Sequence, residues 1–158
     1  CQDNEISWLD WGLLEKNREL FDFFRYMIRF RLEHPAIRRE LPDAACGLEG
    51  VRIYGADAAS GEAAAREAGT IGICFAGHDS GKGRDDLVYL ALNVYWEDVR
   101  ITLPVLKDGS FWYVCVNTAG DGEGKFCYEK NGQVRIDGEF IMRKRSAAVF
   151  VGRQETPS

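Results

Sequence analysis

The chain has 158 residues, of which 25 are acidic and 20 basic, and its formal net charge is −5. Its length is typical of one domain, and its hydrophobic (46%) and charged (28%) fractions exclude a wholly disordered protein. No apolar run approaches the roughly 20 residues that a membrane span needs. An acidic chain also lacks the basic face typical of nucleic-acid binding. We therefore expect a globular protein with neither a membrane nor a nucleic-acid partner.

The cysteines bear on metal binding and on cellular location, and the first residue bears on whether the chain is a piece of a longer protein. The five cysteines are odd in number and form no Cys-x-x-Cys pair, and the two histidines lie far apart. The sequence therefore offers no zinc ligand set, and we expect no metal or cofactor. A reduced cytoplasmic location is the simplest interpretation. Because residue 1 is Cys1 rather than Met and no signal peptide is recognisable, we expect a piece of a longer protein.

Residues 1–42 contain one of the 17 glycines and one clear helix, which apolar spacing predicts over Glu15–Glu33. The apolar side chains fall on two faces, the first with Leu20, Phe21, Phe24, Met27, Ile28 and Leu32 and the second with Phe23, Tyr26 and Phe30. Such a helix needs two partners, of which one small sandwich can supply only one. Pro35 ends the helix, and His34 is interpreted as a capping residue rather than a catalytic one.

Residues 43–158 are predicted to be all-β, with short strands and glycine-rich turns that indicate an antiparallel sandwich. The expected strands are Thr70–Phe75, Leu87–Val94, Val99–Leu103, Phe111–Val116, Ala147–Val151 and a hairpin of Phe126–Lys130 with Gln133–Ile136 around Asn131-Gly132. Ala56–Ala68 is expected to be a mobile loop or a short surface helix. Arg143–Arg145 is expected to be a solvated strand edge.

The stretch Ala76–Gly83 resembles a phosphate-binding loop only superficially. Gly83 stands where such a loop needs a hydroxyl residue, and a strand rather than a helix follows. His78, Asp79 and Ser80 are neighbours in this loop, and neighbours in a loop cannot hold the geometry of a catalytic triad. An exposed hairpin loop is the better interpretation of both patterns.

Residues 3–11 contain several side chains of the kinds that bind sugars. Carboxylates, an amide and two indoles lie close together, as they do in many sugar-binding sites: Asp3, Asn4, Glu5, Trp8, Asp10 and Trp11. Alternatively, the indoles anchor a core and Asp10 caps the following helix. A retaining glycosidase needs two carboxyl groups about 5–5.5 Å apart, and nothing in the sequence selects such a pair.

Three stretches of sequence resemble the glycogen debranching and isoamylase-type enzymes of the α-amylase superfamily. The first is C-Q-D-N-E-I-S-W-L-D-W, followed by L-x-x-N-x-x-L and R-F-R-x-x-H-P-A-I-R. The other two stretches resemble the C-terminal β-sandwich of that family. The second is L-V-Y-L-A-L-N-V-Y-W-E-D-V-R-I-T-L-P, followed by F-W-Y-V-C-V-N-T-A, and the third is R-S-A-A-V-F. Residues 44–69 match poorly. The resemblance implies that residues 1–42 are the terminal loop and last helix of a (β/α)₈ barrel, here Lys16–Glu33, and residues 43–158 the sandwich.

The resemblance also implies a function, the hydrolysis of α-1,6 branch linkages in glycogen with retention at the anomeric carbon. The three catalytic carboxylates of the family lie upstream of the opening motif, and a barrel needs at least about 200 residues. We therefore expect a catalytically inert chain that serves as a structural domain packed on the barrel. Because loops after barrel strands face the active site, Asp3, Asn4 and Trp8 are expected near the glucan substrate.

Two further expectations concern partners. The sandwich could instead be a carbohydrate-binding module for α-glucans, with Trp96, Trp112 and Tyr113 as a stacking platform on strands, although core packing is the favoured interpretation of these residues. Trp112 and Tyr113 fall on opposite faces of a strand, so only one of them can join a given platform. The uncovered helix face, including Phe21, Phe24 and Ile28, also predicts self-association.

Overall fold

The computed structural model describes residues 2–48, 50–58, 69–107, 109–120 and 125–154. Two α-helices, α1 (Leu13–Lys16) and α2 (Arg18–Glu33), precede a β-rich region. The strands are β1 (Gly50–Tyr54), β2 (Thr70–Asp79), β3 (Arg84–Asn93), β4 (Val99–Thr102), β5 (Ser110–Asn117), β6 (Val134–Ile136), β7 (Glu139–Met142) and β8 (Ser146–Gln154). Within these described ranges, no helix has the length and hydrophobicity needed to cross a bilayer.

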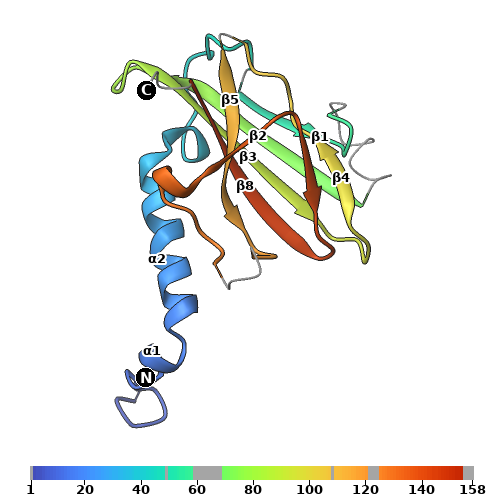
Figure 1. The fold of residues 1–158 in the computed structure, drawn as a ribbon. Coiled ribbons are helices and arrows are strands. Elements are labelled where there is room, and N and C mark those ends of the chain that lie inside the picture. Colours follow the sequence, from blue (N-terminus) through green and yellow to red (C-terminus); the bar gives the residue numbers. More distant parts are fainter. Residues whose placement is uncertain (1, 49, 59–68, 108, 121–124, 155–158) are drawn as a thin grey trace.

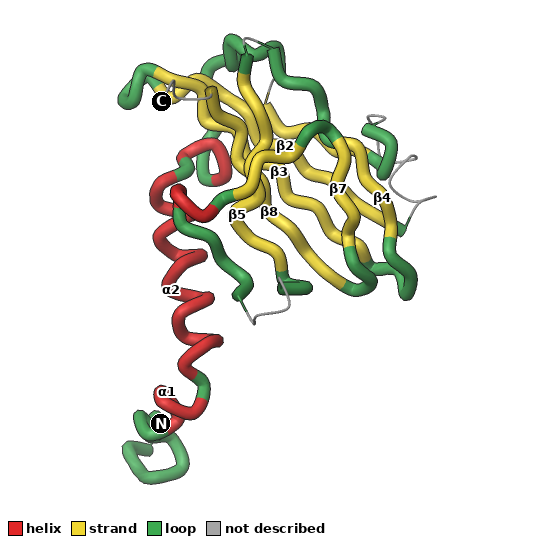
Figure 2. Tube along the Cα trace, viewed as in Figure 1, coloured by secondary structure: helices red, strands yellow, loops and turns green. Residues whose placement is uncertain are grey.

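The strands form two antiparallel sheets of unequal size. One has six strands in the order β1-β2-β3-β8-β5-β6, and the other pairs β4 with β7. The small sheet covers one face of the large sheet, and α2 lies against the other face (Figure 1; Figure 2). The predicted antiparallel sandwich is therefore confirmed, with the helix as a third layer.

The core between the two sheets is aromatic. Tyr89 of β3 contacts Trp112 of β5 and Phe150 of β8, and Phe150 packs edge-on against Phe140 of β7 with ring centroids 5.1 Å apart. Gly72 of β2 makes room for this cluster, because a Cβ there would lie 1.8 Å from the hydroxyl oxygen of Tyr89. The alternation of side chains along each strand places these residues on one face of the large sheet.

Helix α2 uses one of its two apolar faces to cover the other side of the large sheet. Phe23, Tyr26 and Phe30, the second face predicted from the sequence, pack against side chains of β3, β5 and β8, and Met27 joins them. The Tyr26 hydroxyl donates a hydrogen bond of 3.0 Å to the carbonyl oxygen of Tyr128. The remaining residues of the first face stay exposed, so the sandwich covers one helix face, as expected.

Two adjacent aspartates at the start of β3 hold the segment that joins the helix to the sandwich. The Asp86 carboxylate lies 2.5 Å from Nδ1 of His34 and accepts the N–H of Ala36 at 2.9 Å. Asp85 lies on the opposite face of the strand, 3.0 Å from Nδ1 of His78, and accepts the N–H of Cys46. The division at residue 42 stays a prediction, since this segment binds the two regions to one another.

His34 is the C-cap residue of α2, as predicted, but its imidazole pairs with Asp86. The last carbonyl of the helix, that of Glu33, instead accepts a hydrogen bond from Lys82 Nζ. Lys82 lies in the tight loop of residues 80–83 between β2 and β3. The exposed loop predicted for Ala76–Gly83 is therefore wrong for its first half, because Ala76–Asp79 belong to β2 and are largely buried. A sequence that resembles a phosphate loop therefore positions the helix on the sheet.

Several local expectations are wrong. The hairpin expected around Asn131-Gly132 does not form, because Lys130–Gly132 is a 3₁₀ helix. Of its two expected strands, the second contains β6, which pairs with β5, and the first contributes an isolated bridge between Cys127 and Val116. Arg143–Arg145 lies between β7 and β8 instead of at a strand edge, and strands β1 and β7 were not predicted. Of the expected loop Ala56–Ala68, residues 56–58 lie in a turn and the rest fall outside the described residues.

Candidate functional site

The predicted substrate-binding residues lie together in one compact turn. The Trp8 indole N–H donates a hydrogen bond to the Asp3 carboxylate. Asn4 Oδ1 accepts the N–H of Ile6 at 3.1 Å, and the Asn4 carbonyl accepts the Ser7 hydroxyl at 2.9 Å. The turn therefore brings Asp3, Asn4 and Trp8 into one surface that combines an indole, a carboxylate and an amide.

This turn lies at the end of the helix that is remote from the sheets (Figure 1). Trp8 and Trp11 are 60% and 74% exposed, so the alternative that these indoles anchor a core is wrong for this chain. The Asp10 carboxylate accepts the N–H of Gly12 at 2.9 Å, but Gly12 is the N-cap residue of α1 and no side chain caps this helix, so the prediction that Asp10 is the cap is wrong. The structure leaves the indoles free to contact another molecule.

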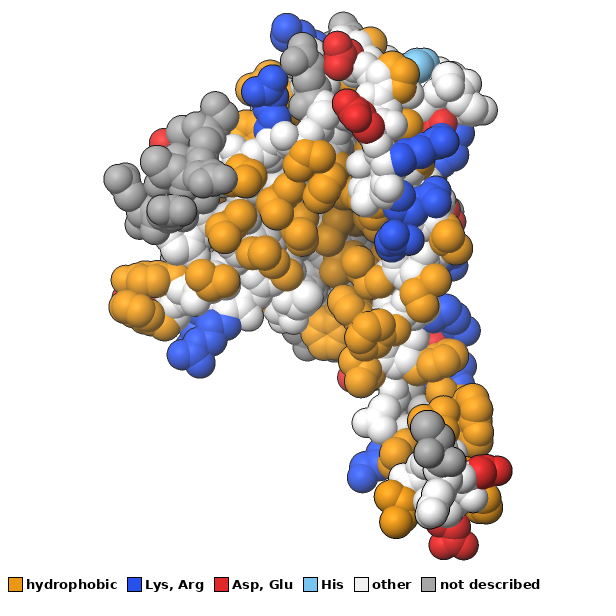
Figure 3. All heavy atoms as spheres, turned by 180° about the vertical axis from the view of Figure 1, so that it is seen from behind, with side chains coloured by type: hydrophobic (Ala, Val, Ile, Leu, Met, Phe, Trp, Pro, Cys, Tyr) orange, Lys and Arg blue, Asp and Glu red, His pale blue; other side chains and the backbone are white. Residues whose placement is uncertain are grey.

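A broad apolar face extends from the helix onto the large sheet. On α2 it consists of the exposed side chains Leu20, Phe21, Phe24, Ile28 and Leu32. On the sheet it continues through cross-strand neighbours that are not fully buried: Val51 opposite Phe75, Ile53 opposite Ile73, and Ile73 opposite Leu90. Figure 3 shows hydrophobic side chains gathered over this side of the sheet beside the helix. We call this surface the apolar face.

The size of the accessible surface agrees with an uncovered face. The chain exposes 10448 Å², whereas a compact monomer of its mass, 17.8 kDa, exposes about 8,000 Å². A protein partner in a standard interface buries about 800 Å² of its own surface. The excess is therefore large enough for an extensive interface.

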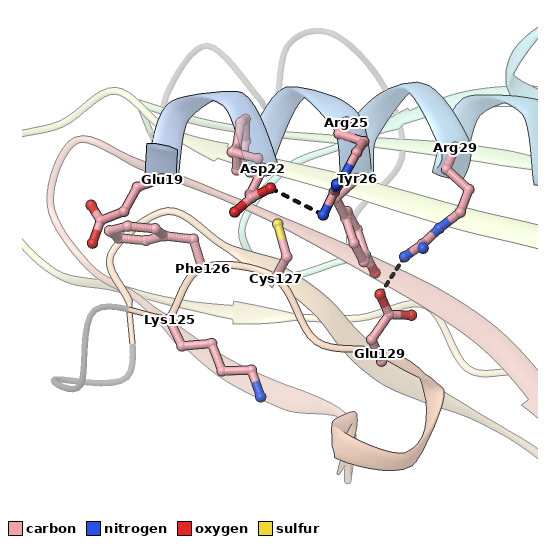
Figure 4. A pocket seen from close by; sticks show the side chains of 10 residues that line it. Glu19, Asp22, Arg25, Tyr26, Arg29, Lys125, Phe126, Cys127 and Glu129 are labelled. Atoms are coloured by element: carbon pink, nitrogen blue, oxygen red, sulfur yellow. Dashed lines mark hydrogen bonds and ion pairs between the residues drawn. The ribbon is translucent and has the colours of Figure 1, made fainter. Parts of the chain in front are cut away.

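A groove lies between α2 and the segment 125–129 (Figure 4). Its main cavity has a volume of about 340 Å³ and is lined by Glu19, Asp22, Phe23, Arg25, Tyr26, Arg29, Lys125, Phe126, Cys127 and Glu129. Across the cavity, Arg29 forms an ion pair with Glu129. On α2 itself, Arg25 contacts Asp22 at 3.0 Å. A second cavity of about 290 Å³ shares Glu19, Phe23 and Phe126 with the first.

Two titratable groups that line this groove, Cys127 and Tyr26, have raised pKa values. Burial, with the nearby charge of Glu129, raises the pKa of the Cys127 thiol to about 11. The thiol is therefore protonated at neutral pH, and a protonated thiol is a poor nucleophile. Burial also raises the pKa of Tyr26 above its ordinary value. Among the described residues, no group of three or more His, Cys, Asp or Glu is arranged to hold a metal ion.

The predicted stacking platform of the sandwich is wrong. Trp112 is 3% exposed, and its indole N–H donates a hydrogen bond of 2.7 Å to the carbonyl of Pro104 inside the core. Tyr113 is buried on the opposite face of the same strand, beneath the helix. Trp96 is 63% exposed, but it lies in the connection between β3 and β4. These three rings therefore form no common flat surface.

Comparison with known proteins identifies the family of the sandwich. The sequence profile of the family described as isoamylase, C-terminal, matches residues 40–151. This chain belongs to the isoamylase C-terminal family. The match covers both sheets from β1 to β7 and most of β8, and α2 precedes the matched residues.

Curated relatives of this isoamylase C-terminal domain extend the likeness beyond the sandwich. The protein named isoamylase from Pseudomonas amyloderamosa is 24% identical over 136 residues, which are 86% of this chain and 17% of that protein. The glycogen operon protein GlgX homolog of Mycobacterium tuberculosis is 46% identical over 39 residues, which are 25% of this chain and 5% of that protein. The chain therefore spans less than a fifth of the length of these relatives.

Proposed function

We propose that the chain is the C-terminal part of a glycoside hydrolase that cleaves α-1,6 branches of glycogen or a related α-glucan. Membership of the isoamylase C-terminal family and the names of the two relatives, isoamylase and glycogen operon protein GlgX homolog, support this proposal. In it the chain carries none of the catalytic carboxylates. Its role is structural: it packs on a catalytic (β/α)₈ barrel, of which α2 is the last helix.

The observation that carries the structural role is the apolar face. Removing apolar surface from water contributes about 25 cal/mol per Å², and contiguous exposed patches beyond a few hundred Å² are typical of interaction sites. In the proposed enzyme the outer side of α2, with Phe24 and Ile28, packs on neighbouring barrel elements. The second side of α2 already holds the sandwich. The helix would therefore fasten the two parts of the enzyme to each other.

The proposal assigns the opening turn to the substrate. Asp3, Asn4 and Trp8 would lie at the rim of the glucan cleft, where the indole can stack on a sugar ring and the polar groups can bind hydroxyls. The hydrogen bond between Trp8 and Asp3, which fixes the indole, supports this role. We also place the enzyme in the cytoplasm, because a reducing compartment keeps thiols such as those of Cys74, Cys115 and Cys127 reduced.

The catalytic part of the proposal is tested by assaying the chain on glycogen. We expect no release of linear chains above the blank, measured as new reducing ends, while an isoamylase added to the same substrate releases them. Circular dichroism establishes that the assayed chain is folded. Release of chains by the folded protein alone would contradict the proposal, since it would require catalytic carboxylates within these 158 residues.

The structural part is tested by mixing the chain with the separately produced remainder of a longer enzyme that carries it. We expect a complex by size-exclusion chromatography and recovery of debranching activity. Phe24→Glu should weaken the complex because it places a charge in the apolar face. The control Ile141→Glu lies on β7, in the opposite layer of the sandwich, and should leave the complex intact. Equal behaviour of the two variants would exclude α2 from the interface.

A further inference from the structure

The groove between α2 and the segment 125–129 has no part in the function proposed above. We propose that this groove binds a linear segment of α-glucan, as a second site remote from the opening turn. The ligand class rests on the proposed function, whereas the site itself rests on the shape and charge of the groove. Figure 4 shows Cys127 and Glu129 turned toward α2, whereas Lys125 extends away from the helix.

The dimensions of the groove suit an extended ligand. Its two cavities share Phe23 and Phe126, and their lining follows α2 from Glu19 to Arg29. Ten residues of α-helix correspond to about 15 Å. The main cavity, of about 340 Å³, lies at the lower end of the range of roughly 300–1,000 Å³ for small-molecule sites. A short run of sugar units fits such a shape better than a single small ion does.

The charges of the groove favour a neutral ligand. Three acidic residues (Glu19, Asp22 and Glu129) and three basic residues (Arg25, Arg29 and Lys125) line the main cavity, so its formal charge is zero. Two of the three acidic residues are already paired, Asp22 with Arg25 and Glu129 with Arg29. An anion or a cation would have to compete with these pairs. Sugar hydroxyls can instead donate to the carboxylates and accept from the guanidinium groups without breaking them.

The apolar part of the groove supplies the second feature of a sugar site. Phe126 and Phe23 stand where the two cavities meet, and Leu20 extends the apolar lining. A pyranose ring presents C–H groups on its faces and hydroxyls around its edge, so it can stack on an aromatic ring while its edge reaches polar groups. Aromatic rings at one end and paired charges at the other match both parts of this ligand.

The proposal is tested by titrating the chain with maltoheptaose, a linear α-1,4-linked glucan, while backbone amide shifts are followed by NMR. We expect saturable shifts at residues that line the groove. Phe126→Ala should weaken binding about two- to tenfold, since it removes the aromatic ring on which a sugar can stack. Trp96→Ala removes an exposed aromatic side chain that does not line the groove and should leave the affinity unchanged.

A second variant and a second probe complete the experiment. Glu129→Gln keeps the shape of the groove but removes the ion pair with Arg29, and it should also weaken maltoheptaose binding. If Phe126→Ala does not give the circular dichroism spectrum of a folded protein, Glu129→Gln takes its place in the experiment. Inorganic phosphate should produce no saturable shifts at the groove. Binding of phosphate in preference to maltoheptaose, or shifts at Trp96 instead of the groove, would overturn the proposal. Absence of groove binding would leave the inertness and packing tests above unaffected.

Discussion

The two faces of the large sheet differ in how completely this chain covers them. The face toward β4 and β7 is closed, and Tyr89, Ala91 and Phe150 at its centre are almost inaccessible to solvent. The opposite face is covered by α2, by the segment that follows it and by Cys127, and Ile73 and Leu90 remain partly exposed beside them. The closed face is therefore a domain core, whereas the open face is the surface that we propose as an interface.

The largest expected effect is a difference in unfolding free energy between two variants, each of which removes a phenylalanine ring from one face. Phe150→Ala should lower the free energy of unfolding by about 3–5 kcal/mol, because it leaves a cavity among Tyr89, Trp112 and Phe140. Phe24→Ala, on the open face, should change it by less than about 0.5 kcal/mol. Urea denaturation followed by circular dichroism measures both. Similar losses for the two variants would show that the exposed helix face is packed in solution.

Self-association is the next largest effect, because the open face can be covered by a second copy of the chain. We expect sedimentation equilibrium to show concentration-dependent association. Phe24→Glu combined with Ile28→Glu should weaken it at least about tenfold, since each buried apolar side chain contributes about 1.5–3 kcal/mol. Ile141→Glu, in the opposite layer, serves as the matched control. A wild-type chain that stays monomeric at high concentration would contradict this prediction.

The smallest effect concerns the pH dependence of the attachment between helix and sandwich. Burial alone would raise the pKa of Asp85, but hydrogen bonds from His78 and from the N–H groups of Cys46 and Ala45 outweigh burial and hold this pKa below its ordinary value. A lowered carboxyl pKa stabilises the fold above the unfolded-state value of about 3.9, and this contribution disappears as the pH falls through the folded-state value. Asp85→Asn should therefore make unfolding less dependent on pH below about pH 4.

Thermal unfolding at a series of pH values measures this effect. Arg100→Gln is a suitable control, because it removes an exposed ion pair with Glu139 on the small sheet and leaves the Asp85 contacts in place. An unchanged acid limb in Asp85→Asn would show that the His78 contact does not set this pKa.

The candidate sites differ in how far the sequence could predict them. Asp3, Asn4 and Trp8 lie within six positions and their hydrogen bonds are local, so a short motif is enough to predict that they lie close together. Their place near a substrate stays a prediction. The groove could not be found in this way. Its pairs join residues about a hundred positions apart, such as Arg29 with Glu129 and Tyr26 with Tyr128, and no spacing rule connects them. The Trp96, Trp112 and Tyr113 platform failed for the same reason, because burial depends on which layers cover a strand.

By itself, the sequence determined the family, the antiparallel sandwich and the two-faced helix, because side-chain periodicity and family motifs are properties of neighbouring residues. Only the tertiary structure decided that Asn131-Gly132 belongs to a 3₁₀ turn, that Lys82 holds the end of the helix, and which helix face meets the sheet. These outcomes depend on contacts between distant segments. Such contacts form because the assembled layers together remove apolar surface from water. The amount of surface removed depends on all the layers and cannot be read from a single segment.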